Sequence, residues 1–128
     1  MEKPRKPVQT FRDLIAWQKA MELARQVYRH TKKMPEDERF GLTNQMRRAV
    51  VSVPSNIAEG FARQSLPDYL KFLRTARGSL AELSTQGELA TGMEMIPHHQ
   101  EIESLMHETT RVLQFLIMSL QRKQRDTE

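Results

Sequence analysis

The stretch that decides the fold is Gln45-Met-Arg-Arg-Ala-Val-Val-Ser-Val-Pro-Ser-Asn-Ile-Ala-Glu-Gly-Phe-Ala-Arg63. Apolar residues in and just before it recur at steps of three and four, which stacks them along one side of an α-helix. They are Leu42, Met46, Ala49, Val50, Val53, Ile57 and Phe61. The pattern predicts a helix over about residues 42–63 whose apolar side belongs to a buried core.

A polar stripe runs along the same helix, about a quarter turn from the apolar one. It consists of Gln45, Arg48, Ser52, Ser55, Asn56, Glu59 and Arg63. A solvated face is usually rich in Lys and Glu, whereas short hydroxyl and amide groups suit contact with another backbone or a hydrogen-bonded network. We therefore expect a structural polar network that fixes the register between two helices. Its expected members are Gln45, Ser52, Ser55, Asn56, Glu59 and, from the following helix, Glu82.

Pro54 lies in the interior of this predicted helix. A proline there removes one backbone hydrogen bond and bends the helix axis, at a cost of about 3 kcal/mol unless neighbouring groups compensate. The alternative is two shorter helices that meet at Val53, because the residue before a proline disfavours the helical region.

The composition sets the class of protein. A chain of 128 residues makes one domain, and five Gly, six Pro and no alternating β-branched run argue against a sheet. With no cysteine, disulfides, thiolate nucleophiles and cysteine-type zinc sites are excluded. There is no apolar run that resembles a signal peptide or a membrane span, so we expect a cytoplasmic protein without membrane contact.

Three further helices follow from the same kind of pattern. Capping boxes at Thr10–Asp13 and Ser65–Asp68 begin helices over about 11–32 and 66–91, and a fourth covers about 97–121. In the first, the expected seam repeats at heptad steps and is widened by three further apolar residues. The heptad positions are Leu14, Trp17, Met21, Ala24 and Tyr28, and Ala20, Leu23 and Val27 widen the seam. In the third, Gly78, Ser79 and Gly87 indicate a closely approaching neighbour.

Short connections between these helices predict an all-α, up-down-up-down antiparallel four-helix bundle over residues 10–121. Residues 1–9, with two prolines and three basic groups, are expected to form a flexible basic arm, and residues 122–128 a polar tail.

Charge is unevenly distributed along the chain. Residues 1–33 carry nine Lys or Arg and three Asp or Glu, whereas residues 94–112 carry four Glu and one Arg. A basic first helix and an acidic start of the last helix attract each other within a subunit or between subunits, or the basic end meets a polyanion. Mixed-sign solvated faces are the alternative.

Motifs for metal or catalytic chemistry are absent from the sequence. Di-iron bundles need Glu-x-x-His on facing helices, which does not occur here. Glu103 and His107, with His99 one turn earlier, leave a metal-dependent enzyme as a minor alternative. Without a nucleophile, metalloprotease or phosphate-loop motif, we expect neither an enzyme nor a cofactor.

The remaining feature is a candidate basic surface on the second and third helices. Its residues are Arg47, Arg48, Arg63, Lys71, Arg74 and Arg77. One interpretation is that these arginines pair with Glu59 between helices, and the other is that they contact phosphates. Phosphate binding would depend on salt rather than on base sequence, because few aromatic residues are interleaved for stacking.

The motifs resemble one known family, the four-helix-bundle 23S rRNA intervening-sequence proteins, once called S23 ribosomal proteins. The matching segments are Phe11-x-Asp-Leu14, Trp17-Gln-Lys-Ala20, Pro35–Glu38 with Phe40-Gly-Leu42, Gln45-x-Arg-Arg-Ala49, the ungapped Ser52–Gly60 run and Ala76-Arg-Gly-Ser-Leu80-x-Glu82. The family is similar in fold to the accessory variability proteins of diversity-generating retroelements, which form pentamers and engage a reverse transcriptase and its RNA. The resemblance implies a homopentamer with a positively charged surface or channel.

Two functions are consistent with these residues. The first is a non-enzymatic homo-oligomer, pentameric by the resemblance, that binds structured RNA through the basic surface. The second is a protein-interaction scaffold for a partner such as a reverse transcriptase, with the polar stripe of residues 45–63 as subunit contact and no RNA specificity of its own.

Overall fold

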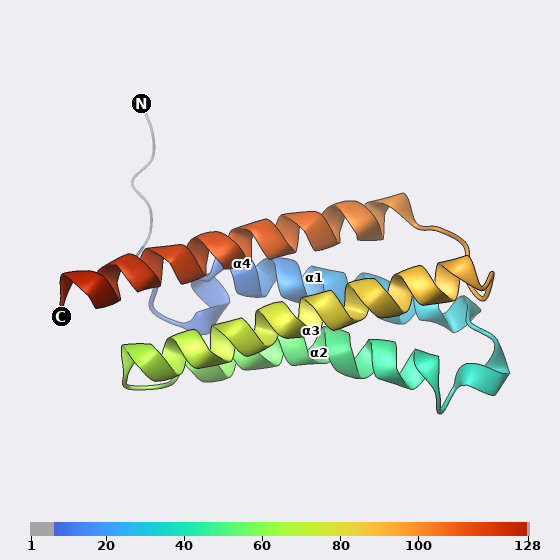
Figure 1. Cartoon of the computed structure of the whole chain (residues 1–128), viewed down its shortest axis with the longest axis horizontal. Helices are drawn as coiled ribbons and strands as arrows, with labels where there is room; N and C mark the ends of the chain where they lie inside the picture. Colours follow the sequence, from blue (N-terminus) through green and yellow to red (C-terminus); the bar gives the residue numbers. More distant parts are fainter. Residues whose placement is uncertain (1–6, 128) are drawn as a thin grey trace.

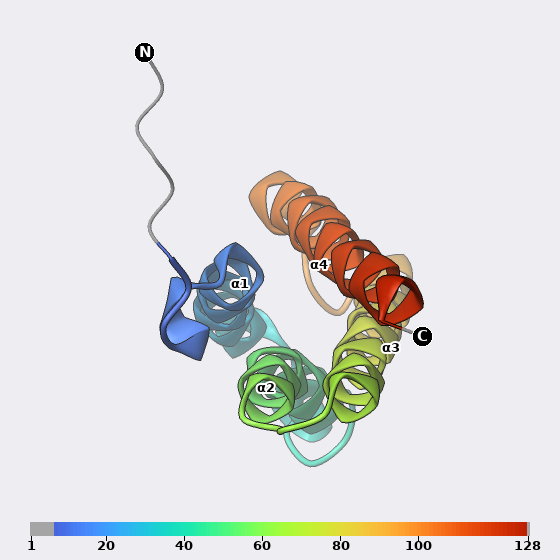
Figure 2. The same ribbon diagram turned by 90° about the vertical axis from the view of Figure 1, so that its left-hand side faces the viewer.

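The computed structural model, which describes residues 7–127, is an all-α, up-down-up-down antiparallel four-helix bundle, as predicted (Figure 1). Its helices are α1 (Ile15–His30), α2 (Leu42–Phe61), α3 (Leu66–Gly92) and α4 (Gln100–Asp126). Three short 3-10 turns accompany them, η1 (Phe11–Asp13), η2 (Thr31–Lys33) and η3 (Glu36–Glu38). Viewed along the bundle, α1 and α3 lie on opposite sides, with α2 below and α4 above (Figure 2).

One core fills the space between the four helices. The predicted apolar side of α2 contributes Val50, Val53 and Ile57, all fully buried. Burial of a side chain of this size stabilises the fold by about 1.5–3 kcal/mol. The largest fully buried side chains from the other helices are Leu23, Leu70, Leu73, Leu83, Leu113 and Ile117.

The centre of the buried face of α1 is the widened part of the predicted seam rather than its heptad positions. Ala20, Leu23 and Val27 form the buried centre of the face, whereas Met21 is half-buried and Tyr28 is 41% exposed. The apolar arc of α1 is wide, and the helix packs against both α2 and α4, so the middle of the arc is buried rather than the edge that the heptad steps select. The remaining seam residues follow the same pattern: Leu14 is buried and Trp17 and Ala24 are half-buried.

The helix ends differ in part from the predicted ones. The capping box of Thr10 and Asp13 is present, but it closes around η1, because Leu14 is extended and separates that turn from α1. Ser65 begins α3 as predicted, since its Oγ accepts a hydrogen bond from the Asp68 amide at 3.3 Å. The fourth helix starts three residues later than expected, at Gln100, and ends at Asp126. Residues 122–126 of the expected tail are therefore helical.

Pro54 lies inside the continuous helix α2, so the alternative of two helices meeting at Val53 is wrong. The side chain of Asn56 donates to the Ser52 carbonyl at 2.8 Å, which adds a hydrogen bond to the turn that contains the proline. Most of the expected basic arm, residues 1–6, lies outside the described residues.

Candidate functional surfaces

The polar stripe of α2 meets α3 along what we call the α2–α3 seam, formed by Ser52, Asn56 and Gly60 against Ser79 and Phe72. The Oγ atoms of Ser52 and Ser79 are 2.8 Å apart and share a hydrogen bond. Asn56 Nδ2 donates to the Ser52 hydroxyl at 2.9 Å, which extends the bonded group to three side chains. These hydroxyl and amide groups join the two helices where the sequence predicted a network.

The other predicted members of the network lie outside this bonded group. Gln45, Ser55, Glu59 and Glu82 are exposed. The Glu59 carboxylate pairs with Arg63 at 2.9 Å along its own helix, so the expected ion pair between helices is absent from the described residues. Glu59 pairs within the segment because Arg63 follows it by four positions and therefore lies on the same side of the helix.

Gly60 is the residue that lets α2 and α3 approach most closely. A Cβ atom at this position would lie 2.8 Å from the Phe72 Cβ and 3.1 Å from the Tyr69 ring. The ring of Tyr69 packs edge-on against Phe61, and burial raises the pKa of Tyr69 to about 12. Within the described part of one chain, no neighbour approaches Gly78 or Gly87 closely, because both Cβ positions face open space.

The six predicted phosphate-binding residues separate into two groups. Arg63, Lys71 and Arg74 are exposed beside the turn between α2 and α3, and the Arg63 guanidinium lies over the Phe72 ring. At this end of the bundle α4 also finishes, with three exposed cations in the segment expected to be a tail (Figure 1). Together they form what we call the basic end: Arg63, Lys71, Arg74, Arg122, Lys123 and Arg125.

The other three predicted residues have different roles. Arg47 donates to the Thr31 hydroxyl at 3.0 Å and to the Tyr28 carbonyl at 3.3 Å, and thereby ties α2 to the last turn of α1. Arg77 donates to Gln114 at 3.0 Å and ties α3 to α4. Arg48 is exposed on α2, away from the basic end. The six residues therefore do not form one surface.

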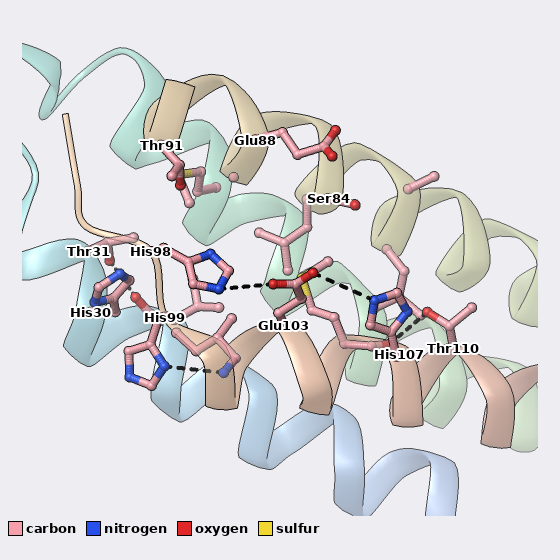
Figure 3. A pocket seen from close by; sticks show the side chains of 18 of the residues that line it. His30, Thr31, Ser84, Glu88, Thr91, His98, His99, Glu103, His107 and Thr110 are labelled. Carbon is pink, nitrogen blue, oxygen red and sulfur yellow. Dashed lines mark hydrogen bonds and ion pairs between the residues drawn. The ribbon is translucent and has the colours of Figure 1, made fainter. Parts of the chain in front are cut away.

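A groove opens between the second half of α3 and the first half of α4, and we call it the α3–α4 groove (Figure 3). Its volume is about 1220 Å³, and Leu80, Leu83, Ile102 and Met106 give it an apolar floor. On its α4 rim, Phe115 is 64% exposed. Sequence reasoning missed the groove, because each helix separately shows an ordinary apolar stripe.

All four histidines of the chain line this groove. His30 Nε2 donates to the Pro97 carbonyl at 2.9 Å, and its ring packs edge-on against His99, whose Nδ1 accepts from the Ile102 amide. Burial lowers the pKa of His30, and the neighbouring His99 and Lys33 lower it further. These contacts hold the α3–α4 connection against the end of α1.

The predicted candidates for metal binding lie on the α4 wall of the groove. Glu103 Oε2 is 3.1 Å from His98 Nε2, and its other oxygen is 4.0 Å from His107 Nε2 (Figure 3). His99 faces His30 instead. Among residues 7–127 no group of three or more His, Asp or Glu side chains has the arrangement of a metal site. In the same range, no helix combines the length and the apolar character that a membrane crossing requires.

The fold defines the class of the protein as a small, all-α four-helix bundle. The sequence model of the 23S rRNA-intervening sequence protein family matches residues 12–118, and the chain belongs to that family. It is similar to a crystal structure of an S23 ribosomal protein family member of unknown function from Bacteroides thetaiotaomicron VPI-5482. The identity is 25% and the TM-score is 0.69, over 83% of this chain and 98% of the other. No curated protein matches the chain.

Proposed function

We propose that this protein is a non-enzymatic homo-oligomer, pentameric by its resemblance to the retroelement accessory proteins, that binds structured RNA through the basic end. The observation that carries the proposal is the convergence at that end of exposed cations from one turn and two helices. Arg63 lies in the α2–α3 turn, Lys71 and Arg74 lie in the first part of α3, and the last turns of α4 add Arg122, Lys123 and Arg125. Apart from the Arg63–Glu59 pair, none of the six pairs with an acid among the described residues.

The chemistry of these residues favours phosphate groups over bases. Guanidinium groups bind phosphate oxygens in pairs, and Lys adds a mobile point charge. The partly buried Phe72 ring has the Arg63 guanidinium over one face, which is then closed to a stacked base. Recognition would therefore follow the shape of a folded RNA, with strong dependence on salt.

A salt titration of RNA binding tests the proposal. The affinity of the full chain for a folded RNA should fall steeply between about 50 and 200 mM salt, because bound phosphates release counterions. Charge reversal by Arg74→Glu with Arg122→Glu should weaken binding by at least about tenfold and lower the salt slope by about one for each lost contact. Arg39→Glu, at the opposite end of the bundle, is the matched control and should bind like wild type.

The opposite result would decide for the second function. Binding that ignores salt, or that survives both reversals, would rule out the basic end as an RNA site. If a partner protein is captured and stays bound after nuclease treatment, that result would support the second function, a scaffold for a polymerase-like partner.

A further inference from the structure

The segment that connects α3 to α4, together with the adjoining parts of both helices, is acidic. Residues 78–110 contain six glutamates and not one Lys or Arg, so all 20 basic residues lie elsewhere. This segment comprises the second half of α3, the connection and the first part of α4, which together wall the groove. The glutamates are Glu82, Glu88, Glu94, Glu101, Glu103 and Glu108. Of these glutamates, Glu88 and Glu103 line the groove near the α3–α4 connection, whereas Arg77 and Arg111 line it farther along. The groove therefore has an apolar floor and is acidic at the end beside the connection.

The outer face of α1 has the complementary character. Met21, Ala24 and Tyr28 form an incompletely buried apolar strip, and a shallow hollow lies along it. Arg25, Arg29 and Lys32 border the same hollow. We call these six residues the α1 basic face. An amphipathic helix of this kind, apolar in the middle and basic at the edge, fits the acidic end of a groove with an apolar floor.

The two surfaces do not meet within one chain. On the α1 basic face the Tyr28 ring lies under Arg47 of α2, whereas the groove lies between α3 and α4. Within residues 7–127 the one ion pair between α1 and α4 is Lys19–Glu108. Arg29 and Lys32 pair with no acid in that range, and neither does Glu88 on the groove wall.

We propose that the α3–α4 groove receives the α1 basic face of a second copy of this chain. The contact rests on the homo-oligomer of the proposed function and names the two surfaces that make it. Gly87, whose Cβ position is open, and the small Ser84 leave room on the α3 wall for a close helix. Because two different surfaces join, the contact is heterologous, and it builds a closed ring when the rotation between copies closes.

Charge reversal and charge exchange test this contact, with particle mass measured by light scattering on the full chain without RNA. Arg29→Glu with Lys32→Glu should reduce the mass to that of one chain, 15.0 kDa, and so should Glu88→Lys with Glu103→Lys. A chain that carries all four substitutions has both charges exchanged and should assemble again. Arg122→Glu with Lys123→Glu reverses the same number of charges at the basic end and should leave assembly intact.

The outcomes separate this contact from RNA binding. Circular dichroism of each variant should show wild-type helix content, so that loss of mass reports the interface rather than unfolding. A wild-type oligomer that survives both reversals, or a folded four-substitution chain that stays at 15.0 kDa, would overturn the contact and leave RNA binding untouched. A wild-type chain of one-chain mass would overturn the contact and the homo-oligomer together. RNA binding lost by the Arg122→Glu and Lys123→Glu variant, with assembly intact, is the result expected if both proposals hold.

Discussion

The two sides of α3 are built in opposite ways. Toward α2, Gly60 removes a side chain and Ser52 bonds Ser79, so the backbones approach and the seam closes. Toward α4, small residues such as Ala81 and Ser84 face Glu103, His107 and Thr110, which do not fill the space between the helices. Both sides use small residues on α3, and the opposite helix decides whether a seam or a groove results.

This difference shows which contacts the chain completes alone. The α2–α3 seam has its hydrogen bonds and its close packing within one chain. The α3–α4 groove leaves the apolar rim residues Phe115 and Met118 in contact with water, which marks sites of interaction with other molecules. We therefore expect substitutions in the seam to change stability and substitutions in the groove to change association.

The largest effect is expected from Leu73, which is fully buried on α3. Leu73→Ala should lower the free energy of unfolding by about 2–5 kcal/mol, because it removes buried apolar volume and leaves a cavity. Leu89→Ala, on the same helix but 52% exposed, is the control and should change the free energy by less than about 0.5 kcal/mol. Denaturant unfolding measures both, and equal effects would show that the assigned core is wrong.

The glycines distinguish the seam from the groove directly. Gly60→Ala should destabilise the chain by about 1–3 kcal/mol, because its Cβ would overlap Phe72. Gly87→Ala has open space and should stabilise the helix by up to about 1 kcal/mol through its helix propensity. Thermal unfolding of the two variants should therefore shift in opposite directions. If both variants shifted the unfolding temperature in the same direction, the proposed difference in packing between Gly60 and Gly87 would be wrong.

A smaller effect is expected from the hydroxyl pair of the seam. Ser52→Ala removes the hydrogen bond to Ser79 and one acceptor of Asn56, at a cost of about 0.5–1.5 kcal/mol. Ser55→Ala, one turn along on the exposed side, should be neutral or slightly stabilising. A double-mutant cycle with Ser79→Ala measures the coupling, and a coupling of zero would mean that the bond does not stabilise the seam.

The smallest expected effect is on pH dependence at the closed end of the groove. The pKa of His30 is lowered in the fold, chiefly by burial, so the unfolded chain takes up the proton first. Its contribution to stability is complete above the ordinary pKa of 6.5 and declines as the pH falls below that value. His30→Gln should flatten this decline in unfolding measurements between about pH 5 and 7. A wild-type chain that gains stability on acidification through this range would contradict the assignment.

Parts of the structure that depend on one helix at a time could be predicted from the sequence. The apolar side of α2, the Ser65 cap and the four-helix order follow from spacing and from turn residues. The network around Ser52 and Asn56 was predicted because short polar groups on a helix side suit contact between helices.

What depended on two helices together could not be predicted. Which edge of the α1 arc is buried depends on where α4 packs, and Gly60 shows its role only when Phe72 faces it. The scattered cations of α4 become part of the basic end only because the helix continues to Asp126 and finishes beside the α2–α3 turn. The groove likewise forms only where α3 and α4 face each other, because each helix alone shows an ordinary apolar stripe.

Light scattering of the wild-type chain, free of RNA, tests most directly whether the open side of α3 is covered by another copy. The account predicts a particle of about five times the 15.0 kDa mass of one chain, stable on dilution to micromolar concentration. A particle of 15.0 kDa would contradict it, because the apolar rim of the groove and the α1 basic face would then both remain in water.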